Sequence, residues 1–424
     1  MKRHILQAHR ILTRIEGENA YSNMAFYSED VSDMATLLVY GVLENALRID
    51  YILSELVDKR PQRAINVLLK IGVYALENLT DVPKFAIVSE CVESAKAIGK
   101  GGASGFVNAV LKKVANGDYT LPSKDDDNYL SVTYSKPQWF IDKLKNQYGY
   151  EKTLEIITAK SEHLEHIRPN LRLTTAQSIL DELNAKGEKC KLSEVGGIIA
   201  RGTPIIKRLF DKGLVTYQSP SSMLAVQALA PQSGGRILDI CSAPGGKAVY
   251  ASEICRDGEI VACELHPHRI NLIEKYKKRM RADNVTPVQC DATVYKPEWK
   301  ENFDRVLADV PCSCFGTFLK HPDVFLSRGE KEIETLAATQ KLILKNAGEY
   351  VKKGGILIYS TCTLFEEEND AVVSDLLKSG KFEPVHISAL DGLEGGIYID
   401  NGGSAQILPH GEYDGFYIAK LRKL

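Results

Sequence analysis

The stretch RILDICSAPGGKAVYASEI, Arg236 to Ile254, decides the fold. Its first residues, Arg236 to Ile240, have the apolar pattern of a strand, and a helical pattern begins near Lys247. Between them, small residues and paired glycines let a ligand approach the backbone closely. The P-loop spacing G-x-x-x-x-G-K-[ST] and the dinucleotide pattern G-x-G-x-x-G are both absent. The stretch therefore predicts a strand, a ligand-binding turn that is not a dinucleotide site, and a helix.

Further strand patterns follow, and amphipathic helical stretches lie between most of them. The predicted strands are Glu259 to Glu264, Pro287 to Cys290, Val306 to Asp309 and Ile356 to Ser360. This alternation is typical of a doubly wound parallel sheet, so we predict a Rossmann-like α/β domain over residues 217–424. The tail segments QILP and DGFYIAKLRKL are predicted to be edge strands that close the sheet.

Carboxylates stand at the ends of two predicted strands. Glu264 ends the second strand, where an acidic residue is well placed to hold a ribose diol, and Asp291 follows the third. Each alone is more often a simple strand-end cap. Taken with the glycine turn, they predict one nucleoside-shaped ligand that lies across three strand ends.

Two cysteines follow the last two strands of this predicted sheet. Cys312 lies in DVPCS, Asp309 to Ser313, and Cys362 lies in YSTCT, Tyr359 to Thr363. The carboxyl ends of parallel strands are where such sheets bind ligands, so both thiols are candidates for chemistry. Cys312 and Cys314 resemble metal ligands, but no paired His or Cys cluster completes a site, and no metal is predicted.

The rest of the chain divides into two parts before the sheet. The pattern is helical from about Ser28 to Asn116, which predicts an all-α bundle over residues 1–120. A polar linker, Leu121 to Tyr129, leads to a small mixed segment, which we assign to residues 130–216 as a linker and RNA-recognition subdomain. Its predicted elements are a helix at Pro137 to Tyr148, a strand at Asn170 to Thr174 and a helix at Ala176 to Lys186.

Composition sets limits on location and partners. With 44% hydrophobic and 25% charged residues and no apolar run of membrane-spanning length, the chain is expected to be a soluble protein without a membrane partner. Its start lacks a secretory signal, and its nine cysteines include no C-x-x-C pair. We therefore expect a cytoplasmic protein with reduced thiols.

A net charge of −2 does not itself indicate nucleic-acid binding, so any basic surface must be local. The stretch from His266 to Asn284 is rich in Lys and Arg, although a solvated helix face explains it equally well. The candidate RNA-binding residues are Lys277, Lys278, Arg281, Arg168 and Arg172.

The motifs LDICSAPGGK, DVPCS and YSTCT resemble those of RNA cytosine-5 methyltransferases that use S-adenosylmethionine. SKPQWFIDKLKNQYG and RPNLRL are similar to the region that precedes their catalytic domain. LVYGVLENALRIDYIL, LLKIGVYAL and GFVNAVLKK are similar to a NusB-like helical domain. Together they resemble the RsmB (Sun) group of bacterial enzymes that methylate 16S ribosomal RNA.

The resemblance implies a role for each motif. Cys362 would be the nucleophile, Cys312 would assist product release, and Asp309 would lie between the base and the methyl donor. The residues that would hold S-adenosylmethionine are Cys241, Ser242, Ala243, Pro244, Gly245, Gly246, Lys247, Glu264, Asp291 and Asp309. Two departures stand out: Glu264 replaces a more usual aspartate, and Cys314 stands where the family often has glycine.

The expected partner is RNA, most simply 16S ribosomal RNA, and the expected state is a monomer. Two alternatives stay open: the same chemistry on transfer RNA or another RNA, and an inactive RNA-binding assembly factor. The presence of Cys312, Cys362 and Asp309 disfavours the inactive factor.

Overall fold

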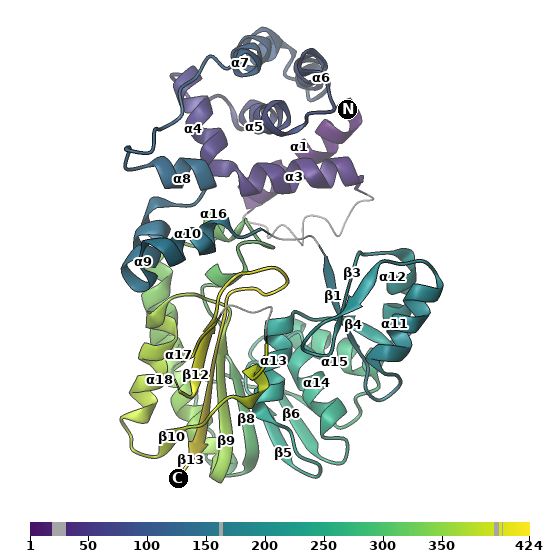
Figure 1. Ribbon diagram of the computed structural model, residues 1–424, viewed down its shortest axis with the longest axis vertical. Helices are drawn as coiled ribbons and strands as arrows, with labels where there is room; N and C mark the ends of the chain where they lie inside the picture. The colour runs from purple at the N-terminus through teal and green to yellow at the C-terminus, as the bar shows by residue number, and fades with distance from the viewer. Residues whose placement is uncertain (19–30, 161–163, 394–397, 401) are drawn as a thin grey trace. The chain divides into compact units, whose positions relative to one another are not determined.

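The computed structural model describes residues 1–18, 31–160, 164–393, 398–400 and 402–424. They form two compact units, shown in Figure 1. One unit contains Met1–Thr158 and a later segment, His321–Gly329. The other contains Ala159–Lys320 and Glu330–Leu424. The chain therefore leaves the second unit once and returns to it.

The first unit is helical, as predicted. Its first helices are α1 (Lys2–Glu18), α3 (Asp33–Glu44), α4 (Ala46–Leu56), α5 (Arg63–Asn78), α6 (Lys84–Ala97) and α7 (Ser104–Asn116). Helix α5 is buried without a break from Ile65 to Leu76, as befits the central helix of a bundle. Helix α1 lies before the predicted start of the helical region at Ser28, a start that falls outside the described residues.

Four further α-helices of this unit lie within the described residues. They are α8 (Tyr129–Tyr134), α9 (Gln138–Tyr148), α10 (Tyr150–Thr158) and α16 (Val324–Ser327). Helix α9 confirms the predicted helix from Pro137 to Tyr148. Phe325 of α16 packs edge-on against Phe140 of α9, with ring centroids 5.0 Å apart. This aromatic contact fixes the segment His321–Gly329 in the helical unit.

A nine-stranded sheet forms the centre of the second unit. Its strands are β5 (Arg236–Asp239), β6 (Glu259–Glu264), β7 (Val285–Gln289), β8 (Phe303–Asp309), β9 (Val351–Thr361), β10 (Phe382–Pro384), β11 (Tyr398–Asp400), β12 (Ser404–Ile407) and β13 (Phe416–Lys423). The order β7-β6-β5-β8-β9 is parallel, which confirms the doubly wound sheet. The chain reverses direction across the sheet between β5 and β8, and such a switch point is where open α/β sheets bind ligands.

The tail extends this sheet in antiparallel fashion. Strand β13 pairs with β9 on one side and with β12 on the other. The prediction that DGFYIAKLRKL forms an edge strand is therefore wrong, because β12 and β10 both hydrogen-bond to its outer side. Six of its eight residues are buried, which explains why this segment is so apolar.

Helices cover both faces of the sheet (Figure 1). Helices α13 (Pro220–Leu229), α14 (Gly246–Ile254) and α15 (Pro267–Met280) share one core, which includes Ile237, Ile273 and Ile358. Helices α17 (Glu330–Tyr350) and α18 (Asp370–Leu377) share the other, which includes Leu238 and Leu357. Neighbouring strand residues point to opposite cores, so both faces must be apolar.

A smaller antiparallel sheet precedes the large one in the second unit. Its strands are β2 (Cys190–Leu192), β3 (Ile198–Ala200), β1 (Glu165–Pro169) and β4 (Val215–Tyr217), with helices α11 (Ala176–Ala185) and α12 (Pro204–Asp211). Helix α11 confirms the predicted helix at Ala176. The strand predicted at Asn170 to Thr174 is wrong, because the strand ends at Pro169. The Asn170 side chain accepts a hydrogen bond from the Arg172 backbone and makes a turn there.

No helix within the described part of the chain combines the length and the apolar character needed to cross a membrane.

Candidate active site

The turn after β5 is built for close approach to the backbone. The Ser242 amide donates to the Cys263 carbonyl at 2.7 Å, which ties the turn to β6. Gly245 then begins α14 with a φ of +107°, a conformation that side-chain-bearing residues rarely adopt. A Cβ at this position would lie 3.3 Å from Ile273. Glycine at this position therefore lets α14 start close to α15. The first backbone N–H groups of α14 have no partner within the helix and remain available to a ligand.

Asp239, the last residue of β5, is a site residue that the sequence prediction missed. It is almost fully buried, and none of the described residues donates to its oxygens with normal hydrogen-bond geometry. The buried Ser242 hydroxyl is also without a partner among those residues. Burial, together with the negative charge of Asp309, raises the pKa of Asp239 to about 7. The sequence Leu238-Asp239-Ile240 gives little sign that Asp239 belongs to the site, because an aspartate at a strand end is commonly only a cap.

We expect Asp239→Asn to stabilise the ligand-free protein at neutral pH. An unfolded Asp ionises near pH 4, whereas the folded carboxyl keeps its proton up to about pH 7. The free energy of unfolding should therefore fall as pH rises between those values, by roughly 2–4 kcal/mol. The asparagine variant lacks this loss, so its advantage should grow from pH 5 to pH 8. Urea unfolding at both pH values measures it, and an equal difference at both would contradict the raised pKa.

Asp309 lies at the end of β8 and is held from two sides. Lys247 of α14 reaches its carboxylate at 2.6 Å, and the Ser360 hydroxyl donates to its other oxygen at 2.7 Å. Burial lowers the pKa of Lys247, but the charge and hydrogen bond of Asp309, together with the charge of Asp239, outweigh this and leave the pKa raised. The structure thus pairs Lys247 with a protein carboxylate in the absence of ligand. Asp309 projects between the glycine turn and the end of β9.

The two predicted rim carboxylates lie at the ends of β6 and β7, as their positions required. Glu264 is buried, accepts from the His266 backbone at 2.9 Å and pairs with Arg269 at 3.2 Å. Asp291 is exposed, and hydrogen bonds from the Thr293 hydroxyl and amide lower its pKa. Both carboxylates are thus held in place by hydrogen bonds, and those of Asp291 favour its charged form.

The two candidate cysteines are neighbours in space. Strands β8 and β9 pair in parallel, as predicted, and the Sγ atoms of Cys312 and Cys362 lie 3.2 Å apart. A third thiol, Cys314, lies 4.0 Å from the Cys312 Sγ. The sequence showed no His or Cys pair that completes a metal site around Cys312 and Cys314, but the structure brings Cys362, fifty residues later in the chain, beside them.

Both cysteines are protonated thiols at neutral pH. Hydrogen bonds from Cys314 and Cys362, together with burial, raise the pKa of Cys312 well above that of a free thiol. The thiol of Cys312 lowers the pKa of Cys362, but Cys314 and burial outweigh this and leave it raised well above the ordinary value. A reaction that uses either sulfur as a nucleophile must first remove its proton.

A buried glutamate, Glu368, joins the two cysteine loops and was also missed. Its carboxylate accepts from the Ser313 amide at 2.8 Å and from the Gln340 amide at 2.9 Å. Gln340 in turn donates to the Pro311 carbonyl. Glu368 lies in the acidic run after YSTCT, and nothing in the run distinguishes it from its exposed neighbour Glu366. It positions Pro311 and Ser313 on either side of Cys312.

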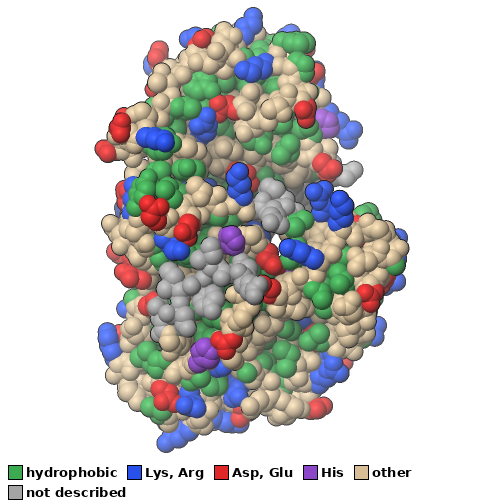
Figure 2. Space-filling model, in the orientation of Figure 1, with side chains coloured by type: hydrophobic (Ala, Val, Ile, Leu, Met, Phe, Trp, Pro, Cys, Tyr) green, Lys and Arg blue, Asp and Glu red, His purple; other side chains and the backbone are tan. Residues whose placement is uncertain are grey.

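The predicted basic helix is α15 and the residues after it. Lys278 and Arg281 are exposed, whereas the Lys277 amine donates to the Val285 carbonyl at 2.6 Å and is half-buried. Arg279 turns inward, donates to the Phe210 and Val215 carbonyls and packs over the Phe210 ring. On the face shown in Figure 2, basic and acidic side chains are interspersed, so any RNA-binding surface here is local.

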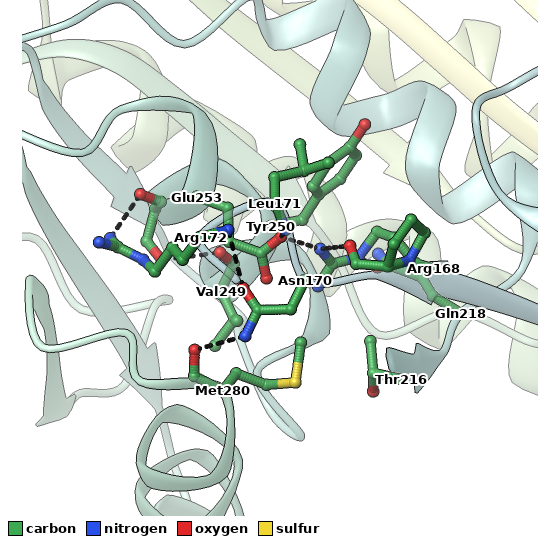
Figure 3. A network of polar contacts seen from close by, with 12 residues as sticks. Arg168, Asn170, Leu171, Arg172, Thr216, Gln218, Val249, Tyr250, Glu253 and Met280 are labelled. Carbon is green, nitrogen blue, oxygen red and sulfur yellow. Dashed lines mark hydrogen bonds and ion pairs between the residues drawn. The ribbon is translucent and has the colours of Figure 1, made fainter. Parts of the chain in front are cut away.

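Two arginines predicted to contact RNA have other partners, as Figure 3 shows. Arg168 is buried, forms an ion pair with buried Glu253 and lies 4.5 Å from the Tyr250 ring centroid. A side chain with 1% exposure has no surface for RNA, so the structure does not fit this role for Arg168. Arg172 is half-buried and donates to the Ser252 carbonyl at 2.7 Å. Both residues join the small sheet to α14.

The chain matches two family models. Residues 226–422 match the family described as 16S rRNA methyltransferase RsmB/F, and residues 6–116 match the NusB family. The probable ribosomal RNA small subunit methyltransferase B of Bacillus subtilis is 33% identical over 97% of each chain. Ribosomal RNA small subunit methyltransferase B of Pasteurella multocida is 30% identical over 91% of this chain and 87% of its own.

Solved structures agree with these matches. The crystal structure of PH0851 has a TM-score of 0.83 and 25% identity, and the match covers 100% of this chain and 98% of that one. NSun6 from Pyrococcus horikoshii, solved with the ligand SFG, shares the fold with a TM-score of 0.59 and 22% identity, over 68% of this chain and 98% of its own.

Methyltransferases of this family use S-adenosylmethionine, and the strand ends described above fit such a ligand. The buried oxygens of Asp239 and Ser242 have no hydrogen-bond partner among the described residues. Buried polar atoms are normally hydrogen-bonded, and a bound ligand would explain these exceptions. Gly245 keeps side-chain atoms away from the start of α14, and the carboxylates of Glu264 and Asp291 lie on the ends of the next two strands. On its sequence, its two domain matches and its site, this chain belongs to the RsmB/F family of 16S rRNA methyltransferases.

Proposed function

We propose that this protein methylates carbon 5 of a cytosine in 16S ribosomal RNA through a covalent adduct with Cys362. The observation that carries the proposal is the pair of thiols, 3.2 Å apart, at the ends of two neighbouring parallel strands beside Asp309. A simple methyl transfer to an amine or hydroxyl needs no thiol. Two adjacent thiols suit a reaction in which one attacks a base and the other assists release.

The chemistry of cytosine explains the need for a nucleophile. Carbon 5 is part of an aromatic ring and attacks poorly, but addition of a thiolate to carbon 6 makes it enamine-like. S-adenosylmethionine supplies a methyl group on a sulfonium, ready for transfer to carbon 5. The proton on carbon 5 must then leave, its electrons re-form the ring double bond, and the carbon–sulfur bond breaks.

Each residue of the site has a role in these reaction steps. Cys362, once its proton has passed to a base, forms the bond to carbon 6, and Asp309 lies between the cytosine and the methyl donor. Lys247 and Ser360 orient Asp309 through the hydrogen bonds described above. Cys312 lies close enough to Cys362 to assist release of the product. The target base must be held out of any stack to reach the thiols.

The proposed ribosomal target is supported by the family and by the relatives, whose names specify the small-subunit RNA. Bisulfite sequencing of RNA from a deletion strain and its complement tests it directly. We expect one cytosine of 16S RNA to lose its methyl mark on deletion and to regain it with the wild-type gene. Loss of a methyl mark only from transfer RNA would identify transfer RNA as the substrate instead. If deletion removes no methyl mark from any RNA, the proposal is contradicted.

We expect Glu264→Ala and Asp291→Ala to weaken S-adenosylmethionine binding without unfolding the protein. A charge-assisted hydrogen bond to the ligand contributes roughly 1.5–3 kcal/mol, so the dissociation constant should rise about tenfold or more. Calorimetry at matched thermal stability measures the change, and Glu259→Ala, at the opposite end of β6, is the control. Wild-type affinity in both variants would remove these carboxylates from the cofactor site.

We also expect the basic segment to contribute to RNA binding. Reversing Lys277, Lys278 and Arg281 to glutamate should weaken RNA binding and flatten its dependence on salt, because fewer counterions are released. Because Lys277 also donates to Val285, the double variant at Lys278 and Arg281 separates RNA contact from local structure. S-adenosylmethionine affinity should not change. An unaltered salt slope would identify this segment as a solvated surface only.

A further inference from the structure

Three thiols converge after strands β8 and β9, and the reaction proposed above uses only two of them. The Sγ atoms of Cys312, Cys314 and Cys362 all lie within 4.8 Å of one another. The Cys312 Sγ lies 3.2 Å from that of Cys362 and 4.0 Å from that of Cys314, and these distances bracket the spacing that a bound soft metal requires. Sulfurs about 2.3 Å from a tetrahedral zinc are separated by about 3.8 Å. The three atoms could therefore bind one ion with shifts of less than an ångström.

The position of Cys314 adds a second observation. Its φ of +63° lies in the left-handed region, which disfavours residues with a Cβ by about 1 kcal/mol or more. Its thiol points back toward Cys312, where it donates to the Cys312 carbonyl at 3.3 Å. Strained backbone conformations of this kind are concentrated at functional sites, and this one places the Cys314 sulfur beside those of Cys312 and Cys362.

We propose that Cys312, Cys314 and Cys362 form a binding site for one soft, thiophilic cation of the Zn²⁺ or Cd²⁺ type. Three thiolates satisfy the preference of these ions for sulfur. Within the described residues no further His, Cys, Asp or Glu completes the group, so the fourth position is left to water or a small ligand. The site resembles an open metal centre rather than a closed structural one.

Binding requires the thiols to lose their protons. Each metal–sulfur bond forms with a thiolate, so up to three protons pass to the buffer as three thiols become ligands. Because protons compete with the cation for the sulfurs, binding should strengthen as pH rises. A bound cation also occupies the sulfur of Cys362. Inhibition of methylation by the cation rests on the proposed function, whereas the binding itself does not.

The test is a titration of the whole chain with Cd²⁺, in a buffer that contains a non-chelating phosphine to keep the thiols reduced. We expect one equivalent to bind, with a sulfur-to-cadmium absorption band and a calorimetric heat that depends on the buffer's protonation enthalpy. Cys314→Ser should weaken binding by at least about tenfold, since one of three ligands is lost. Cys190→Ser, which changes a half-exposed cysteine outside the cluster, should bind as the wild type does.

Cys314→Gly is a second variant, because glycine accepts the left-handed conformation and should fold at least as well. Equal cadmium affinity in wild type, Cys314→Ser and Cys314→Gly would overturn the site. Methylation measured in parallel separates the two proposals. A protein that binds cadmium but does not methylate RNA even when cadmium is left out would keep the site and contradict the proposed function, whereas a protein that methylates RNA but does not bind cadmium would overturn the site.

Discussion

Cys362→Ala is expected to abolish methylation completely and to form no covalent complex with RNA. Without the sulfur of Cys362, carbon 6 is not attacked and carbon 5 never becomes nucleophilic. The measurement is tritium transfer from labelled S-adenosylmethionine to unmethylated 16S RNA. The affinity for the methyl donor, measured by calorimetry, should stay near that of the wild type, which would show that the variant is folded.

Cys312→Ala should behave in the opposite way. It keeps the attacking thiol but lacks the group that assists release, so the second half of the reaction is blocked and its intermediate accumulates. We expect a protein–RNA adduct that survives denaturing gel electrophoresis. An adduct in Cys362→Ala and none in Cys312→Ala would reverse the assignment of the two thiols. No adduct in either variant would contradict the covalent mechanism.

The largest effect on stability is expected at the buried ion pair in Figure 3. Arg168→Ala leaves the Glu253 carboxylate fully buried, with only the Leu171 amide as a hydrogen-bond donor in the described part of the chain. An uncompensated buried charge typically costs about 3–5 kcal/mol. The melting temperature of this unit should therefore fall by on the order of 10 °C.

A double-variant cycle tests the cause of this loss. Arg168→Met with Glu253→Leu removes both charges and keeps most of the volume, so it should recover much of the lost stability. Lys186→Ala breaks the exposed pair with Glu182 and should change stability by less than about 1 kcal/mol. Chemical denaturation of all variants measures these differences. Equal losses in Arg168→Ala and the double variant would point to packing rather than charge.

The sequence predicted the local elements of the catalytic domain well, because its strands are short apolar runs between clear turns. The strand from Glu259 to Glu264 was predicted to the residue, and the parallel pairing of the strands before Cys312 and Cys362 is confirmed. The edge-strand prediction for the tail failed because a strand's neighbours depend on segments far away in the chain. Alternation within DGFYIAKLRKL does not reveal which strand lies beside it.

Long-range partners explain the other failures. The sequence around Arg168 looks the same whether the side chain contacts RNA or a buried glutamate, and its partner Glu253 lies on α14, 85 residues later in the chain. Glu368 is one of three consecutive glutamates, and only the packing of two loops selects it for burial. Cys312 and Cys314 likewise have Cys362 beside them only because the ends of β8 and β9 come together.

The return of His321–Gly329 to the helical unit has a consequence for synthesis on the ribosome. Residues up to Thr158 emerge first, yet Phe140 must wait for Phe325, which is made only after β8. Nascent chains of intermediate length should therefore keep an apolar docking surface open on α9. A chaperone that binds such surfaces would have its longest opportunity there, and would lose it once α16 leaves the exit tunnel.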